Sequence, residues 1–596
     1  MRLPKKNIGP WAREVIDDCS TSLVERVQRG AIYRSVFLTG DENGAPQTKN
    51  KTLSFIEKLS SNIYSPADLR FAITPPEEVG PEERAKASRA SKELNSQIRG
   101  ADVDLKLCEA FDWSLIKGKV MVKLLWSASR KCLDAWVVQP EFMGVMREDI
   151  PELDKQEAFF QSTYMIPQEF QRLIANHPDK KDLLKKVQNY ITPAKDGEGP
   201  DRDTMLKQVV LGGTNPYQAS GTNTSQSARG LVNWLSGPAP TWSPKTMAGL
   251  IRFDELWVWD TDRSDWVTIQ IVGNDCVVEG KGVQRNIFST DPSNPLSGSD
   301  EDNPLRGHHP FLEICPNPLA GYFWGRSEIS SVGLAQKTLN SRVDGINKLL
   351  RKQEDPPMFI RGSSQNEIAI NRLRKPGGWM TDPSPNAEVK PLAPEIPTGL
   401  YESMHEAEAI FDDMADATAV MQGRGESGVR AQGHAETLVR MASPRLKRRA
   451  LRGEKQVSKV GSLAFMILQA KCDTKFKTYV PEDQAGIQSA LPPSDPLAQP
   501  PAPKMKPIEF YLKDVDEEAK VGVDTHSSSP VFAHDARELV FALAKAGAIS
   551  KERLIELTHP PMEDELVSDA ERAKAAQQEL LKQHPELLDR AAGKKK

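Results

Sequence analysis

Two long amphipathic patterns dominate the middle of the chain. In the first, apolar residues recur at spacings of three and four from Ile329 to Leu350, which is the period of one face of an α-helix. We expect this helix to span residues 327–354 and to end before the prolines at 356–357. With a rise of about 1.5 Å per residue it reaches roughly 40 Å, which is long for a helix of a globular protein.

A second helix with the same period is expected over residues 400–422. Its apolar stripe consists of Leu400, Met404, Ala407, Phe411, Met414, Thr418 and Met421. Between the two helices, residues 355–399 are rich in proline and contain a Pro-Gly-Gly turn and short β-like pieces such as Met358–Ile360. A hairpin of two such helices exposes two apolar stripes, so we expect neighbouring subunits to cover them.

The residues before the first long helix mix helical and strand patterns. Alternating apolar residues at Val120–Trp126 predict a strand with one buried face, and Ala135–Val138 predicts a second strand. Leu256–Asp260 and Trp266–Val272 predict a β-hairpin, whose tryptophans we assign to the core rather than to base stacking. A segment at about 195–245, rich in Gly, Ser, Thr and Asn, is expected to be a flexible surface insertion.

The residues after the second long helix begin with a glycine-punctuated loop at 423–433. A helical pattern follows from about His434 to Ala470, and we expect it to be interrupted near Pro444 and Gly453. A proline-rich linker at 492–507 leads to a returning strand, and the tail from 533 to 588 reads as helical. The fold class is therefore α+β.

The composition of the chain argues against several classes of protein. The chain has 596 residues, 38% of them hydrophobic and 27% charged, with a net charge of −4 that argues against a generally basic nucleic-acid binder. The six cysteines form no CxxC pair, which indicates reduced thiols without a zinc ribbon or disulfide framework. The first residues lead into no apolar run, and no apolar stretch is long enough to span a bilayer. We therefore expect no signal peptide and no membrane contact.

Motifs of covalent chemistry are weak or missing. Residues 423–428 fit GxGxxG, but a helical pattern precedes them where a dinucleotide site needs a strand. The sequence contains no GxxxxGK[ST], HExxH or GxSxG pattern. The adjacent His308 and His309 fit a loop better than a metal site. We expect a protein that is not an enzyme and holds no cofactor and no metal.

Two charged stretches are candidate functional surfaces. Glu408, Asp412 and Asp416 form a carboxylate ridge on one helix face. This ridge is a solvated face, a channel-facing or subunit-facing surface, or a metal or nuclease site. The next helix is basic, with Arg440, Arg445, Arg448, Arg449 and Arg452. These arginines form either a solvated face or a contact with DNA phosphate or an acidic neighbouring subunit.

The order of these segments resembles the portal proteins of tailed double-stranded DNA bacteriophages. Local stretches agree: residues 316–327 (PNPLAGYFWGRS) leading into Gln336, Asn340 and Asn347, residues 375–379 (KPGGW) with 389–392 (VKPL), residues 423–429 followed by 435–438 (AETL), and residues 546–554 (AGAISKERL). The similarity covers nearly the whole chain, mainly as architecture, and the insertion at 195–245 has no counterpart.

The resemblance implies a portal fold with a β-rich wing, a long helical stem, a small clip module and a helical C-terminal crown. The parts are the wing (1–326), the first stem helix (327–354), the clip (355–399), the second stem helix (400–422), the tunnel loop (423–433), the kinked wing helix with linker and returning strand (434–512), and the crown and tail (513–596). In this scheme Arg424, Glu426, Ser427 and Arg430 line the DNA channel, and Trp379 contacts a partner at the clip.

The same resemblance implies a homo-oligomeric ring, usually of twelve copies, at one capsid vertex of the virion, assembled in the host cytoplasm. Its partners would be double-stranded DNA, terminase, the major capsid and scaffolding proteins, and head-to-tail adaptor or tail proteins. Two other classes remain open from the residues alone. The first is another structural protein of the phage head or tail, and the second is a metal-dependent DNA-processing enzyme that uses the Glu408–Asp416 ridge.

Overall fold

The structure is a computed structural model that describes part of the chain. The described residues are 1–4, 7–42, 49–66, 69–76, 80–127, 130–165, 168, 170–171, 174, 180–188, 251–262, 264–272, 275–276, 283–285, 305–354, 358–361, 388–391, 397–415, 444–471, 476–481, 505–512, 515, 519–523, 540–545 and 554. They form a mixed helix-and-sheet protein, in agreement with the α+β class. The expected insertion at about 195–245 lies outside the described residues.

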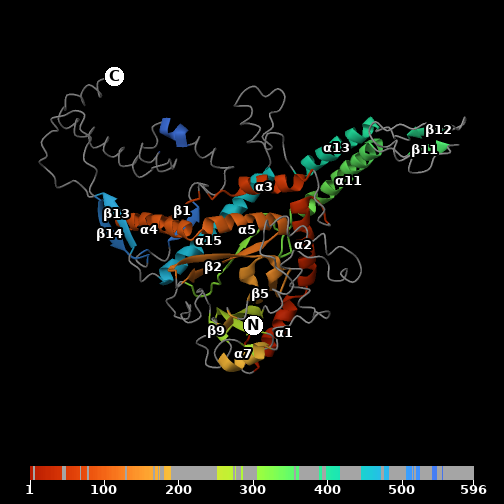
Figure 1. Cartoon of the computed structure of the whole chain (residues 1–596). Coiled ribbons are helices and arrows are strands. Elements are labelled where there is room, and N and C mark those ends of the chain that lie inside the picture. Colours follow the sequence, from red (N-terminus) through yellow and green to blue (C-terminus); the bar gives the residue numbers. More distant parts are fainter. Residues whose placement is uncertain are drawn as a thin grey trace, which may run out of the picture.

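The largest sheet is antiparallel and has six strands. Its order is β4 (Met143–Val145), β5 (Ala158–Met165), β6 (Ile251–Asp260), β7 (Asp265–Val272) and β8 (Asp275–Cys276), and β9 (Val283–Arg285) also pairs with β7. The predicted hairpin is confirmed, since β6 and β7 pair from Asp254–Ile271 to Asp260–Asp265. Helix α1 (Ile8–Cys19) and the start of α2 (Leu23–Thr39) cover one face with apolar side chains. Helix α7 (Lys180–Gln188) lies at the bottom of the molecule in the view of Figure 1.

A smaller antiparallel sheet has the order β10 (Phe311–Ile314), β2 (Val120–Ser127) and β3 (Cys132–Val138). Both predicted strands, β2 and β3, are confirmed, but the expectation of a single buried face for β2 is wrong. Every residue of β2 is buried, because Val122 and Leu124 face the helices while Met121 packs toward the larger sheet. The buried Lys123 is tolerated because its Nζ donates to Gln161 Oε1 at 2.9 Å and also contacts the Glu255 carboxylate.

The main core lies between helices α3 (Lys51–Ile63), α4 (Pro81–Gly100), α5 (Val103–Lys117) and α15 (Pro444–Lys471) and one face of the smaller sheet. The basic helical pattern is α15, and it runs unbroken through Gly453, so the expected interruption there is wrong. Gly453 is needed for close packing instead: a Cβ at this position would lie 3.1 Å from the ring of Phe111 on α5. A larger residue would require the Phe111 ring to shift.

The aromatic side chains of the sheets form a second core. Trp257 and Trp266 are buried against Phe159, whose ring also meets Phe311 edge-on at 5.3 Å between centroids. This confirms the assignment of the hairpin tryptophans to packing rather than to base stacking. Two short 3₁₀ turns, η1 (Pro140–Phe142) and η2 (Leu153–Lys155), connect the strands around this core.

Late segments of the chain return to the body. Strand β15 (Lys520–Val523) pairs with β1 (Phe71–Thr74) and packs on α15, so part of the segment expected to begin a helical crown belongs to the main body. The returning strand is β14 (Met505–Phe510), which pairs with β13 (Phe476–Pro481) and takes in the end of the expected linker. Of the tail expected to be helical, residues 540–545 are helical, and most of the rest lies outside the described residues.

Candidate functional site: the projecting helix pair

Two long helices project from the body side by side. They are α11 (Ile329–Glu354) and α13 (Thr398–Ala415), and they pack along each other (Figure 1). The first confirms the helix predicted at 327–354, with 26 residues and thus roughly 40 Å of length. The described part of the second ends at Ala415 of the predicted 400–422.

A small antiparallel ribbon lies at the far end of the helix pair (Figure 1). Its strands are β11 (Met358–Arg361) and β12 (Glu388–Pro391), with Met358 opposite Pro391 and Arg361 opposite Glu388. The β-like piece predicted at residue 358 is therefore a strand, and its partner includes the VKP stretch singled out above. Trp379, the predicted partner contact in this module, lies outside the described residues.

Buried amides fasten the base of α11 to the body. The Gln336 side chain, fully buried, donates from Nε2 to the Lys49 carbonyl at 2.8 Å and accepts from the Lys51 amide at 3.1 Å. It also donates to Asn340 Oδ1 at 2.8 Å, and Asn340 Nδ2 donates to the Gly40 carbonyl at 2.7 Å. Side chains of this helix thus satisfy backbone groups of Gly40, Lys49 and Lys51. Gln336 and Asn340 of this sequence motif therefore hold α11 against the chain between α2 and α3; we call these two residues the clamp.

Replacing Gln336 by Leu should therefore destabilise the protein. The change leaves the Lys49 carbonyl, the Lys51 amide and the Asn340 side chain without their partner, and we expect a loss of about 2 kcal/mol in unfolding free energy. Asn347→Leu on the same helix is the matched control, since Asn347 is exposed and should change stability by less than about 0.5 kcal/mol. Urea unfolding curves of the two variants would measure the difference, and equal midpoints would contradict the clamp.

The apolar stripes are covered at the base by the chain itself. Val332 and Ala335 of α11 pack with Phe411 of α13, and the Phe411 ring meets Phe55 of α3 edge-on at 6.3 Å between centroids. Leu339 is also buried. The expectation that other subunits must cover both stripes is therefore wrong for the half of the helix pair nearest the body. There the two helices cover each other, and α3 packs against them.

Other apolar side chains of the pair do point outward. Leu334 of α11 is 72% exposed, and Ile410 and Met414 of α13, one helical turn apart, are 46% and 41% exposed. Tyr401, nearer the tip, is exposed as well. Of these four residues, only Met414 belonged to the apolar stripes predicted from the sequence. Several large apolar residues outside the core of one projecting feature indicate a surface for association.

The carboxylate ridge is paired with lysines of the body. Lys51 Nζ lies 2.6 Å from Asp412 Oδ1, and Lys49 Nζ contacts the Glu408 carboxylate. Burial alone would raise the pKa of Glu408, but the hydrogen bond and charge of Lys49 outweigh it and lower that pKa. Asp416, the third carboxylate of the ridge, lies outside the described residues. The two described carboxylates of the ridge, Glu408 and Asp412, are therefore paired with lysines and do not form a plain solvated face.

No local pattern could have revealed these two lysines. Lys49 and Glu408 are 359 positions apart, and the two lysines flank the N-cap Asn50 at the start of α3. Only the packing of α13 on α3 brings the charges together.

The arginines of α15 divide into two kinds. Arg445 and Arg448 are exposed, and Arg452 is partly exposed. Arg449 is buried: its guanidinium forms an ion pair with Glu328, and its Nε donates to Asn317 Oδ1 at 2.8 Å. Arg449 therefore cannot serve as a phosphate contact, which corrects that part of the prediction, because its charge is already used to hold the residues that lead into α11. Arg440 lies outside the described residues.

The predicted tunnel-loop residues Arg424, Glu426, Ser427 and Arg430 also lie outside the described residues. Within the part that is described, no group of three or more His, Cys, Asp or Glu residues is placed to hold a metal ion. His309 stands in the aromatic core, with its ring 5.3 Å from that of Trp266 and its Nε2 3.0 Å from Asp154 Oδ1. None of the described helices combines the length and the apolar character that crossing a membrane requires.

Comparisons with known proteins add no family assignment. No family model matches the chain. No curated protein matches it either.

Proposed function

We propose that this chain is the portal protein of a tailed double-stranded DNA bacteriophage, a ring subunit through which the genome is packed and released. One observation carries the proposal: a pair of long helices projects from an α+β body, ends in a two-stranded ribbon, and carries exposed apolar side chains along its length (Figure 1). An isolated subunit would leave this apolar surface in water, which favours association.

In this proposal the body is the wing, α11 and α13 are the stem, and the ribbon of β11 and β12 belongs to the clip. The loop at 423–433 is the tunnel loop, and the chain after the body forms the crown and tail. A closed ring requires a heterologous contact, in which one side of a stem meets the other side of its neighbour. Leu334 on one helix and Ile410 with Met414 on the other supply apolar groups for such a contact.

DNA transport requires a channel that holds its cargo weakly. Because Lys49 and Lys51 pair with Glu408 and Asp412, these two carboxylates are neutralised and would repel a passing phosphate less than free carboxylates would. The exposed Arg445 and Arg448 of α15 remain candidates for contact with DNA or with an acidic neighbour. In this role the chain does no covalent chemistry, and its partners are terminase, capsid and scaffolding proteins, and tail or adaptor proteins at the portal vertex of the virion.

Electron microscopy of the purified protein tests the proposal directly. We expect radially symmetric particles with an axial hole, most often with twelve subunits, and a projecting stem at one end of the side views. Monomers at micromolar concentration, or helical and sheet-like assemblies, would count against a portal and favour another structural protein. Cleavage of plasmid DNA that depends on a divalent metal would favour the enzyme alternative.

A further inference from the structure

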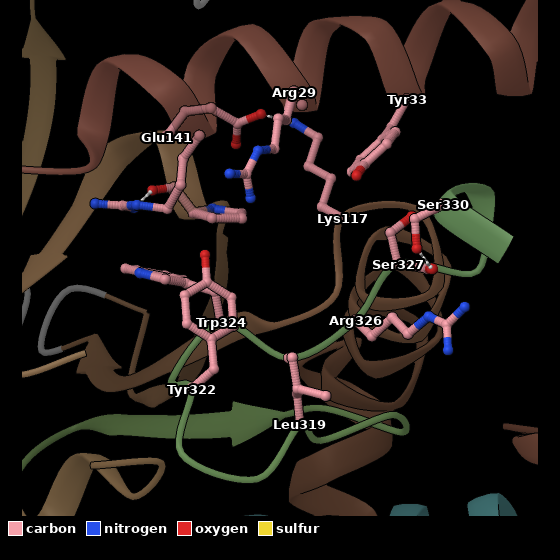
Figure 2. A pocket seen from close by; sticks show the side chains of 14 residues that line it. Arg29, Tyr33, Lys117, Glu141, Leu319, Tyr322, Trp324, Arg326, Ser327 and Ser330 are labelled. Carbon is pink, nitrogen blue, oxygen red and sulfur yellow. Dashed lines mark hydrogen bonds and ion pairs between the residues drawn. The ribbon is translucent and has the colours of Figure 1, made fainter. Parts of the chain in front are cut away.

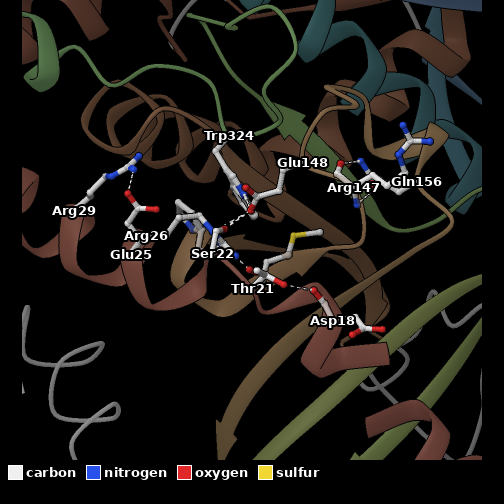
Figure 3. A network of polar contacts seen from close by, with 12 residues as sticks. Asp18, Thr21, Ser22, Glu25, Arg26, Arg29, Arg147, Glu148, Gln156 and Trp324 are labelled. Atoms are coloured by element: carbon white, nitrogen blue, oxygen red, sulfur yellow. Dashed lines mark hydrogen bonds and ion pairs between the residues drawn. The ribbon is translucent and has the colours of Figure 1, made fainter. Parts of the chain in front are cut away.

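Positive side chains gather at two places on the body, and at the first of them the charge is balanced. A cavity of about 190 Å³ lies between α2, the end of α5, the turn η1 and residues 319–330 (Figure 2). Three cations on its walls have carboxylate partners: Lys117 has Glu141, Arg29 has Glu25, and Arg26 has Glu148. Figure 3 shows Arg29 beside Glu25. These pairs leave no shortage of negative charge at the cavity.

The second place is one side of helix α15. Five cations, which we call the basic stripe, lie there in single file: Arg445, Arg448, Arg452, Lys455 and Lys459. Their spacing alternates between three and four, so at 3.6 residues per turn all five fall within about 80° of the helix circumference. From its first to its last residue the stripe is roughly 21 Å long. Arg452 is partly exposed and the other four are exposed.

The basic stripe lacks countercharges along most of its length. Arg445, Arg448, Arg452 and Lys455 form no ion pair with any residue that the structure describes. At the end of the stripe, Lys459 Nζ lies 3.9 Å from Asp154 Oδ2. The single acid of α15, Glu454, stands two positions from Arg452 and therefore about 200° around the helix, away from the stripe. The stripe is thus a surface of free positive charge.

This arrangement weakens the helix and adds nothing to the core. Neighbouring cations of the stripe are three or four positions apart, and like charges at that spacing destabilise a helix. The main core is filled from the other side of α15, by side chains such as Leu446, Val457 and Val460. A row of like charges that opposes the stability of its own helix indicates a functional surface.

We propose that the basic stripe binds the phosphate backbone of double-stranded DNA. The inference names a DNA contact of the proposed portal and rests on that function for the source of the duplex. A duplex carries one negative charge per about 1.7 Å of its axis, so a length equal to the stripe presents about a dozen phosphates to five cations. Contacts with phosphate carry no sequence information, which lets a duplex slide past them.

The charge of the stripe favours DNA over a neighbouring subunit as the partner. The centres of protein–protein interfaces are depleted of charged residues. Interfaces with DNA are much more positively charged, and many of their contacts come from Arg and Lys to phosphate. The whole chain has a net charge of −4, so attraction of a duplex has to come from a local feature such as this one.

Fluorescence anisotropy of a labelled duplex, about 12 base pairs long and titrated with the full chain at several salt concentrations, tests the proposal. Each phosphate contact adds about 0.9 to the steepness of log K against log salt. The four unpaired cations therefore predict a slope of about −3.6 for each chain in contact. Duplexes of unrelated sequence should bind equally. Absence of binding, or a slope near zero, would overturn the assignment.

Arg445→Gln with Arg448→Gln is the variant, and Arg130→Gln with Arg147→Gln is its matched control. Both changes remove two positive charges from exposed side chains, but Arg130 and Arg147 are already paired, with Asp134 and Asp149. The variant should halve the wild-type slope, whatever the number of chains on one duplex, and weaken binding at about 0.1 M salt by about 60-fold or more. The control should bind as wild type. Equal losses in both proteins would trace binding to net charge alone and overturn the proposal.

The outcomes separate this inference from the portal itself. Rings in electron micrographs, together with an unchanged slope in the variant, would overturn the DNA contact and leave the portal proposal standing. A halved slope in a protein that forms no rings would support the DNA contact and count against the portal. Loss of rings in the variant with unchanged DNA binding would assign the stripe to an acidic neighbouring subunit and would overturn the DNA contact as well.

Discussion

Placing glutamate at both Leu334 and Ile410 should convert rings into folded monomers. Each side chain is outside the core, so the single subunit loses little stability. In a ring, each contact would lose the burial of two large apolar side chains, about 3–6 kcal/mol. That is a loss of roughly two to four orders of magnitude in the association constant of every interface. Analytical ultracentrifugation of the variant measures the result.

Leu105→Glu is the matched control for this experiment. Leu105 of α5 is 56% exposed, so the change has the same chemistry on the body instead of the projecting pair. Its rings should sediment as wild type. Intact rings in the Leu334 and Ile410 double variant would show that the projecting pair does not carry the association surface, and the proposed stem would then be wrong even if the protein forms rings by another face.

Replacing Arg449 by Met should cost about 3–5 kcal/mol in unfolding free energy, because it leaves the buried carboxylate of Glu328 without its countercharge. Asn317 bridges the pair: it accepts from Arg449 Nε at 2.8 Å and donates to Glu328 Oε1 at 2.6 Å. The loss should therefore spread to the residues that lead into α11. Chemical denaturation measures the change.

Arg448→Met, one position earlier on α15, separates this structural role from a role in DNA binding. Arg448 is exposed, so its loss should leave stability within about 0.5 kcal/mol of wild type. The double variant Glu328→Met with Arg449→Met should recover part of the lost stability, since removing both charges removes the unpaired carboxylate. Similar stability of Arg449→Met and Arg448→Met would contradict the buried pair.

Patterns within single segments predicted the long helices α11, α13 and α15 and the strands β2, β3, β6 and β7. The stripe from Ile329 to Leu350 located α11 to within two residues, and the hairpin of β6 and β7 followed from alternation on either side of a polar turn. These predictions succeed because helix and strand periods are local properties of the backbone. Gly453 is the exception, because glycine disfavours helices on average but here the helix packs closely on Phe111, whose ring lies 3.1 Å from where a Cβ would be.

The sequence by itself therefore determined the two long helices, the turn-rich module between them and the β-hairpin of the body. Only the tertiary structure decided which charges remain available. It pairs Lys49 and Lys51 with Glu408 and Asp412, and it buries Arg449 while its neighbour Arg448 stays in solvent. It also brings four separate segments, α2, the end of α5, η1 and residues 319–330, together around one cavity. Period and composition carry no information on such contacts, because partners hundreds of residues apart meet only through the packing of whole elements.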